Sequence, residues 1–185
     1  LLDEGLSDAQ RAKGLEIVGR ATLSATGQNL VWMSLIVARR GLLERDPDLV
    51  AAAFRRIADE IRISAEEGIQ ADFSFHQHGP CVYNHGYGSG FATDCSTIAL
   101  LVEGTRFAFP PEKIALLSCY ILDGSGWMAR GGTPEYGAKG REITRRGASA
   151  FTTASSFSTV SEASTAARPK VRSGSRTSMA SLPPL

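Results

Sequence analysis

The fold is decided by residues 46–61, which read DPDLVAAAFRRIADEI. Asp46 is a residue type that caps helix N-termini, and Pro47 suits the first helical position, where no backbone N–H is needed. Apolar side chains then recur at spacings of four, three and four residues, at Val50, Phe54, Ile57 and Ile61. This pattern predicts an amphipathic helix that buries one apolar stripe.

Helical signals continue toward the N-terminus. Ser7 and Gln10 have the S-x-x-Q spacing of a capping box and predict a helix that runs to about Arg20. Residues 30–37 are apolar all round apart from Ser34, as expected of a helix that is enclosed on most sides.

Two further helices are predicted toward the C-terminus, from about Asp94 to Glu103 and from Pro111 to Leu122. In the second, Ile114, Leu117 and Ile121 share one face. Strand signals are scarce. The sequence therefore predicts an all-α fold with two layers of helices, in which some helices are buried on most sides and others bury only one face.

Size and charge restrict the classes of function. The chain has 185 residues, and 20 Lys and Arg against 19 Asp and Glu leave a formal net charge of +1. This balance gives no electrostatic reason to expect a nucleic-acid or membrane partner, and no obligate protein partner is indicated. The longest apolar run, residues 30–37, is far shorter than the roughly 20 residues that cross a bilayer.

Composition changes sharply near Gly147. Residues 148–185 contain 10 Ser and 5 Thr and few large apolar side chains, so we expect a low-complexity tail that is disordered or non-native. Residues 1–147 are expected to form the folded unit. Because the chain begins at Leu1 without an initiator Met or a signal peptide, we expect it to be a piece of a longer protein.

The cysteines do not indicate a special site. Cys81, Cys95 and Cys119 are odd in number and have no C-x-x-C spacing, which argues against a disulfide framework and a thiolate zinc site. We expect them to be ordinary core residues.

A segment without helical periodicity, residues 65–90, contains all three histidines of the chain. Loops of this length inside helical domains are usually functional. One interpretation is a metal site formed by His76 and His78 with His85 or Asp72, and another is that the histidines are structural. The glycines of residues 86–90 lack the Lys-Ser/Thr of a P-loop, so a phosphate site is weakly indicated.

A third interpretation joins distant residues. Asn29 stands at the start of an apolar helix, His78 and Tyr87 lie in the loop, and Arg141 and Arg145 are four residues apart, on one face if that segment is helical. Each of these residues alone also has a structural explanation. Asn29 could cap the helix, and the two arginines could lie on a solvent-exposed face. Together they supply an amide, an imidazole, a phenol and fixed positive charge, which suits removal of a carbon-bound proton from an acidic sugar.

Six motifs contain these residues or lie between them. They are Thr26–Trp32 (TGQNLVW), Glu67–Gln70 (EGIQ), Asp72–Gly79 (DFSFHQHG), Tyr83–Gly88 (YNHGYG), Ile121–Gly124 (ILDG) and Gly140–Arg145 (GREITR). In this order and spacing they resemble the catalytic domain of polysaccharide lyase family 8, which includes hyaluronate, chondroitin AC and xanthan lyases.

The resemblance implies that residues 1–147 form the central part of an incomplete α/α toroid, in a parent protein that is secreted or periplasmic. By position, Asn29, His78, Tyr87 and Arg141 match the catalytic residues of the family, and Arg145 matches a second active-site arginine. The implied reaction is β-elimination of an acidic polysaccharide, foremost a hyaluronan- or chondroitin-type glycosaminoglycan, without a metal or organic cofactor. Members continue into further domains that complete the cleft, so this chain alone is expected to be inactive.

In the implied mechanism, Asn29 and His78 hold the substrate carboxyl group, while Tyr87 takes the proton from C5 and returns one to the glycosidic oxygen. A phenol has an ordinary pKa of about 10, so forming a phenolate near pH 7 costs about 4 kcal/mol. A guanidinium group reduces that cost, which is the role expected of Arg141. His78 is the alternative base.

Three rival functions remain open at this point. The chain could be a non-catalytic carbohydrate-binding or remnant helical domain, or a metal-dependent enzyme that uses the histidines. A toroidal glycoside hydrolase would need two carboxylates across its cleft, and Asp72 and Glu135 are the loop acids available, neither with a convincing partner.

Overall fold

The structure is a computed structural model that describes residues 5–130 and 133–145. The expected tail, residues 148–185, lies outside the described residues, as does the boundary at Gly147. Helices dominate the described ranges, which confirms the prediction of an all-α fold. They are α1 (Asp8–Val18), α2 (Gly27–Glu44), α3 (Pro47–Glu60), α4 (Ser89–Val102) and α5 (Pro111–Cys119).

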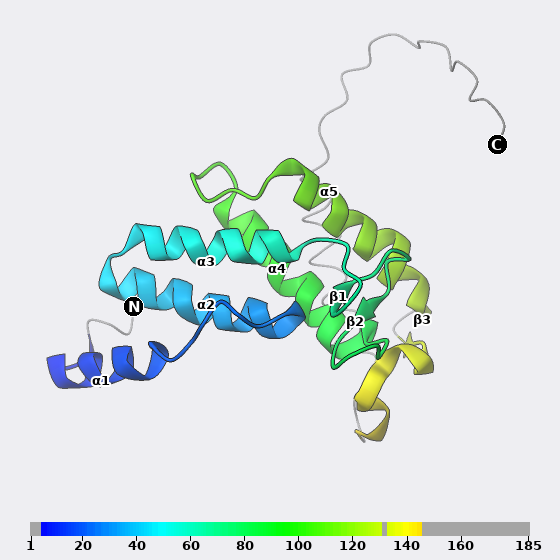
Figure 1. The fold of residues 1–185 in the computed structure, drawn as a ribbon, viewed down its shortest axis with the longest axis horizontal. Helices are drawn as coiled ribbons and strands as arrows, with labels where there is room; N and C mark the ends of the chain where they lie inside the picture. Colours follow the sequence, from blue (N-terminus) through cyan, green and yellow to red (C-terminus); the bar gives the residue numbers. More distant parts are fainter. Residues whose placement is uncertain (1–4, 131–132, 146–185) are drawn as a thin grey trace, which may run out of the picture.

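Helices α2 and α3 run side by side in opposite directions (Figure 1). They are joined at Arg45, whose left-handed backbone (φ 57°) lets the Asp46 N–H donate to the carbonyl of Gly41 at 2.8 Å. The Asp46 carboxylate then accepts from the backbone N–H groups of Asp48 and Leu49 at 3.0 and 2.9 Å. The predicted cap and the Pro47 start are both confirmed.

The capping box of α1 is also confirmed. The Ser7 hydroxyl accepts from the Gln10 N–H at 3.3 Å, and the Gln10 side chain accepts from the Ser7 N–H at 2.9 Å. This helix has no buried residue, so local capping rather than core packing defines its beginning.

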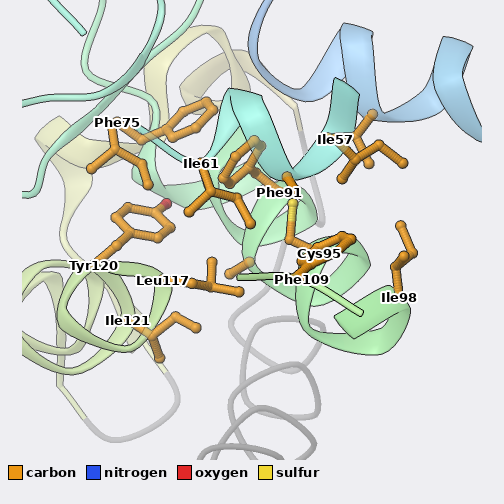
Figure 2. Close-up of a cluster of buried hydrophobic side chains, with 14 of the residues drawn as sticks. Ile57, Ile61, Phe75, Phe91, Cys95, Ile98, Phe109, Leu117, Tyr120 and Ile121 are labelled. Atoms are coloured by element: carbon orange, nitrogen blue, oxygen red, sulfur yellow. The ribbon is translucent and has the colours of Figure 1, made fainter. Parts of the chain in front are cut away.

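One hydrophobic core joins α2 to α5 (Figure 2). Figure 2 shows side chains from α3, α4 and α5 pointing toward one another, with Phe75 and Tyr120 completing the cluster at one end. Full burial of one large apolar side chain is worth about 1.5–3 kcal/mol. Members of the core that are wholly inaccessible are Val31, Ile57, Ile61, Ile69, Phe75, Phe91, Cys95 and Tyr120.

Residues 30–37 are enclosed on most sides, as predicted, except at Trp32, which is 47% exposed. The bounds of two predicted helices need correction. Helix α4 begins at Ser89, five residues before the predicted start at Asp94. Helix α5 ends at Cys119 and continues as a π-helical turn, Tyr120–Gly124, whose residue Ile121 is buried as predicted.

The segment between α3 and α4 is compact and locally paired. Strands β1 (Gly68–Ile69) and β2 (Phe75–His76) form a short antiparallel pair, and a π-helical turn covers Asn84–Gly88. The Asn84 side chain fixes this segment, since its Oδ1 accepts from the Phe75 N–H at 2.8 Å and its Nδ2 donates to Ser125 Oγ at 3.3 Å. In Figure 1 the β1–β2 pair lies beside the first turn of α2.

The last described segment returns to this region. A 3₁₀ turn (Ser125–Met128) leads into the two-residue strands β3 (Ala129–Arg130) and β4 (Thr133–Pro134), and a second 3₁₀ segment covers Tyr136–Thr144. Within the described ranges, no helix combines the length and the apolar character that a membrane span requires.

Candidate active site

The imidazole of His78 is the centre of the candidate site. Its Nε2 lies 2.8 Å from a terminal nitrogen of Arg141, and its ring meets the ring of Tyr87 edge-on at 4.9 Å between centroids. A guanidinium group carries donors and no acceptor, so Nε2 must accept, which leaves the proton of the imidazole on Nδ1. His78 therefore offers an N–H donor on the side away from Arg141.

The backbone of His78 is held in an unusual conformation. Its φ of 61° is left-handed, which costs a non-glycine residue roughly 1–2 kcal/mol. The carboxylate of Glu67 supports this turn by accepting from the N–H groups of His78 and Gly79 at 2.7 and 3.2 Å. The exposed imidazole is thereby turned toward Arg141 and Tyr87.

Gly140 allows Arg141 to reach His78. Its φ of 54° and ψ of −134° break the 3₁₀ segment, and a Cβ at this position would lie 2.4 Å from the ring of Tyr83. Because Tyr83 is completely buried, the ring has no room to move away. A residue without a side chain is therefore needed at the closest approach of the two segments.

Tyr87 lies in an aromatic group that surrounds its ring. The ring of Tyr83 meets it edge-on at 4.9 Å, and the indole of Trp32 lies at 5.8 Å. These rings hold the phenol at the boundary between the core and the surface. Its hydroxyl makes no hydrogen bond to any described residue.

Asn29 lies in the first turn of α2, three residues before Trp32 and so on the same side of the helix. The N-cap of α2 is Thr26, so the interpretation of Asn29 as a helix cap is wrong. Trp32 contacts Tyr87, so this side of α2 lies against the aromatic group around Tyr87. The amide is partly buried.

Arg145 does not join the cluster in this structure. The condition for placing both arginines on one face is not met, because the segment is 3₁₀ in form and Arg145 follows it with an extended backbone (φ −86°, ψ 108°). Its guanidinium pairs with Glu142 at 3.3 Å. The structure thus brings His78 into contact with both Tyr87 and Arg141, places Asn29 on the side of α2 that carries Trp32, and leaves Arg145 on a neighbouring ion pair.

Two titratable groups beside the cluster have shifted pKa values. Burial lowers the pKa of His85, and Glu142, 3.8 Å away, opposes this only in part. Burial tends to raise the pKa of Glu67, but hydrogen bonds from Thr26, Gly79 and His78 outweigh it and hold the pKa below its ordinary value of 4.5. His85 is therefore neutral and Glu67 ionised around pH 7.

The histidines are separated by environment. His76 is partly buried in β2, His78 is exposed, and His85 is buried against Glu142. Within residues 5–130 and 133–145, no group of three His, Cys, Asp or Glu side chains is placed to hold a metal ion. Cys95 is buried as expected, while Cys81 and Cys119 are partly buried, and all three are free thiols.

Sequence reasoning missed three residues that shape the site. Glu67 lies in the EGIQ motif, but the sequence alone does not indicate its function. Gln77 forms hydrogen bonds with Glu67 and with the start of α2. The ring of Tyr83 packs against Tyr87 and Gly140. The available signal was the presence of these polar and aromatic residues inside the motifs. Their partners lie far away in the chain, so spacing alone could not identify them.

Comparison with known families gives a match over most of the chain. Residues 6–173 match the family described as polysaccharide lyase family 8, N terminal alpha-helical domain. The match continues past Gly147, so it does not mark a boundary there.

Similar proteins agree with this match. A chondroitinase-AC of Pedobacter heparinus is 32% identical over 121 residues, which cover 65% of this chain and 17% of that protein. A xanthan lyase of Bacillus sp. is 25% identical over 150 residues, or 78% of this chain and 16% of that protein. A solved chondroitinase AC lyase, studied as enzyme–oligosaccharide complexes, superimposes with a TM-score of 0.74 at 26% identity, covering 90% of this chain and 27% of that one.

Proposed function

The chain belongs to polysaccharide lyase family 8, and from this premise we propose that it forms part of the catalytic domain of an enzyme that cleaves an acidic polysaccharide by β-elimination. The matched residues of this chain span about a sixth of the length of the curated relatives, 17% of one and 16% of the other. We therefore propose that residues 1–147 act as part of an α/α toroid within a longer protein, and that the chain alone is inactive.

The proposed substrate is a uronate-containing glycosaminoglycan of the chondroitin or hyaluronan type. The similarity to a chondroitinase-AC supports an acidic polymer, and the exposed pair of His78 and Arg141 supports it chemically, since both groups favour a carboxylate. A polymer of this kind is an extracellular substrate, so the proposed enzyme is secreted or periplasmic.

The observation that carries the mechanism is the 2.8 Å contact between Arg141 and Nε2 of His78. With Nε2 occupied, His78 is better suited to donate from Nδ1 to the substrate carboxyl group than to act as the base. Asn29, on the adjoining face of α2, is proposed to donate to the same group. Fixed donors at this position stabilise the negative charge that develops on the carboxyl group when C5 loses its proton.

Tyr87 is the proposed base and then acid. Its phenol takes the proton from C5, the bond between C4 and the glycosidic oxygen breaks, and the phenol returns a proton to the leaving oxygen. The products are an unsaturated uronate and a new reducing end of the departing sugar chain. Arg141 bonds to His78, whose ring contacts Tyr87, and from this position Arg141 is proposed to favour the phenolate electrostatically. Arg145 is proposed to act as a second cation once a substrate anion competes with Glu142.

Product analysis tests the proposal. A family-length protein that carries residues 1–147 should convert chondroitin or hyaluronan to products that absorb ultraviolet light through the new double bond. Saturated products would indicate a hydrolase, and retention of the polymer without cleavage would indicate a binding domain. Either result would refute β-elimination.

A further inference from the structure

The carboxylate of Glu67 accepts hydrogen bonds from four donors that belong to two separate segments. One oxygen accepts from the backbone N–H groups of His78 and Gly79 at 2.7 and 3.2 Å. The other accepts from the hydroxyl of Thr26 at 2.7 Å and from the side-chain amide of Gln77. Thr26 immediately precedes α2, whereas Gln77 and the two backbone donors belong to the loop that carries His78.

Gln77 extends this connection into the first turn of α2. It is completely buried, and its Oε1 accepts from the backbone N–H of Gln28 at 3.0 Å. Gly27, with φ 55°, has no side chain at the place where Gln77 passes, and a Cβ there would lie 2.4 Å from Gln77 Oε1. Asn29 directly follows Gln28 in this turn.

From these contacts we propose that Glu67 is a positioning residue that holds the His78 turn and the Asn29-bearing start of α2 as one unit. The importance of Glu67 for catalysis rests on the proposed function, because that function assigns His78 and Asn29 to the same carboxyl group of the substrate. The geometric claim itself does not need the reaction.

The negative charge of Glu67 is essential to this role. All four partners donate to the carboxylate, which is acceptor-only when ionised, and three of them, the two backbone N–H groups and the Gln77 amide NH₂, cannot accept in return. Glutamine has the same size, but its NH₂ group would face a donor on one side. Glu67→Gln should therefore release one of the two segments while leaving the size of the side chain unchanged.

Glu66 provides a matched control. It is the preceding residue and is exposed, and its carboxylate makes no hydrogen bond or ion pair with a described residue. Glu66→Gln removes the same charge from the same turn without touching the network.

Nuclear magnetic resonance of the 185-residue chain tests the proposal. In the parent sequence and in Glu66→Gln, the rings of His78 and Tyr87 should give a nuclear Overhauser effect, and the amide protons of His78 and Gly79 should be shifted by their bonds to the carboxylate. In Glu67→Gln the NH₂ group replaces one acceptor oxygen, so either the amide protons of His78 and Gly79 or the side-chain amide protons of Gln77 should move away from their positions in Glu66→Gln. Unchanged positions for both sets, with the ring contact of His78 and Tyr87 retained, would overturn the proposal.

An acid titration of the parent sequence decides the question even if Glu67→Gln does not fold. The backbone amides of His78 and Gly79, the side-chain amide of Gln77 and the Gln28 amide should shift together with one midpoint below pH 4.5, because the bound carboxylate resists protonation. Independent midpoints, or no shift at all, would show that Glu67 does not couple the segments.

A kinetic measurement separates this proposal from the proposed function. In an active family-length protein, Glu67→Gln should lower kcat more than it raises KM, and Glu66→Gln should change neither. If the protein has no lyase activity but the spectra behave as described, the proposed function fails and the positioning role stands. If activity is present and Glu67→Gln is fully active with unchanged spectra, the positioning role fails.

Discussion

Replacing Gly140 by alanine should damage the site through one methyl group. The backbone at Gly140 has φ 54° and ψ −134°, a conformation that costs a residue with a side chain about 1–3 kcal/mol. The new Cβ would also lie 2.4 Å from one ring atom of Tyr83 and 2.6 Å from two more. Overpacking of this kind costs another 1–3 kcal/mol, so the total is about 2–6 kcal/mol.

The matched control is Gly104→Ala. Gly104 also has a positive φ, 71°, but no atom lies within 4 Å of the Cβ position. This variant therefore introduces backbone strain without a steric clash. We expect it to cost about 1 kcal/mol. Since the backbone costs of the two variants differ by at most about 2 kcal/mol, a larger difference between them reports the contact with Tyr83.

Urea unfolding of the 185-residue chain, followed by circular dichroism, measures the global cost. The chain can also escape the collision by detaching residues 136–144, which would move Arg141 away from His78. The ring resonances of His78 report that escape. If Gly140→Ala unfolds at the same urea concentration as Gly104→Ala and leaves the His78 resonances unchanged, the packing argument is refuted.

Four other outcomes are expected. In an active family-length protein, Tyr87→Phe should abolish the unsaturated product while polymer binding survives in a retardation assay, and near-normal turnover would move the base role to His78. Exhaustive chelation of the same protein should leave its rate unchanged, whereas loss of activity that zinc restores would favour a metal-dependent mechanism. Ile57→Ala, in a side chain with 0% exposure, should lower the free energy of unfolding by about 2–5 kcal/mol, whereas Leu101→Ala, 73% exposed, should stay within about 0.5 kcal/mol. Because the pKa of His85 is lowered on folding, the unfolded chain binds the proton more readily, so stability should fall as pH drops below 6.5, and His85→Gln should reduce that slope in urea titrations at several pH values.

The fold was most predictable where one short segment contains all the determinants. Ser7 with Gln10, and Asp46 with Pro47, cap their helices by contacts within three residues, and both starts are as predicted. The start of α4 was missed because the glycines of residues 86–90 indicate turns, while Ser89 and Gly90 in fact form its first turn.

The exposure of Trp32 was not predictable from its apolar neighbours. A run of apolar residues indicates that a helix is covered but not which segments cover it. In the described ranges, the core lies on the side of Val31, and Trp32 meets Tyr87 at the surface.

The proximity of three candidate residues was predictable from the sequence, but their geometry was not. The motifs identified His78, Tyr87 and Arg141, which the structure brings together. That Arg141 bonds to His78, and that Arg145 turns to Glu142, depends on the break at Gly140, for which helical spacing gives no signal.

The first turn of α2 also has a consequence for the order of folding. The N–H of Gly27 donates to the buried Glu60 at 2.5 Å and that of Gln28 to Gln77, across 33 and 49 residues of chain. Closing such loops costs entropy before any bond is gained, so contacts between distant residues form late. Helix α2 can therefore nucleate through its pairing with α3, which also supplies Glu60 to the Gly27 N–H, while the Gln28 N–H becomes protected from hydrogen exchange only when the His78 loop docks. The part of the helix nearest the candidate site is thus the last part to be completed.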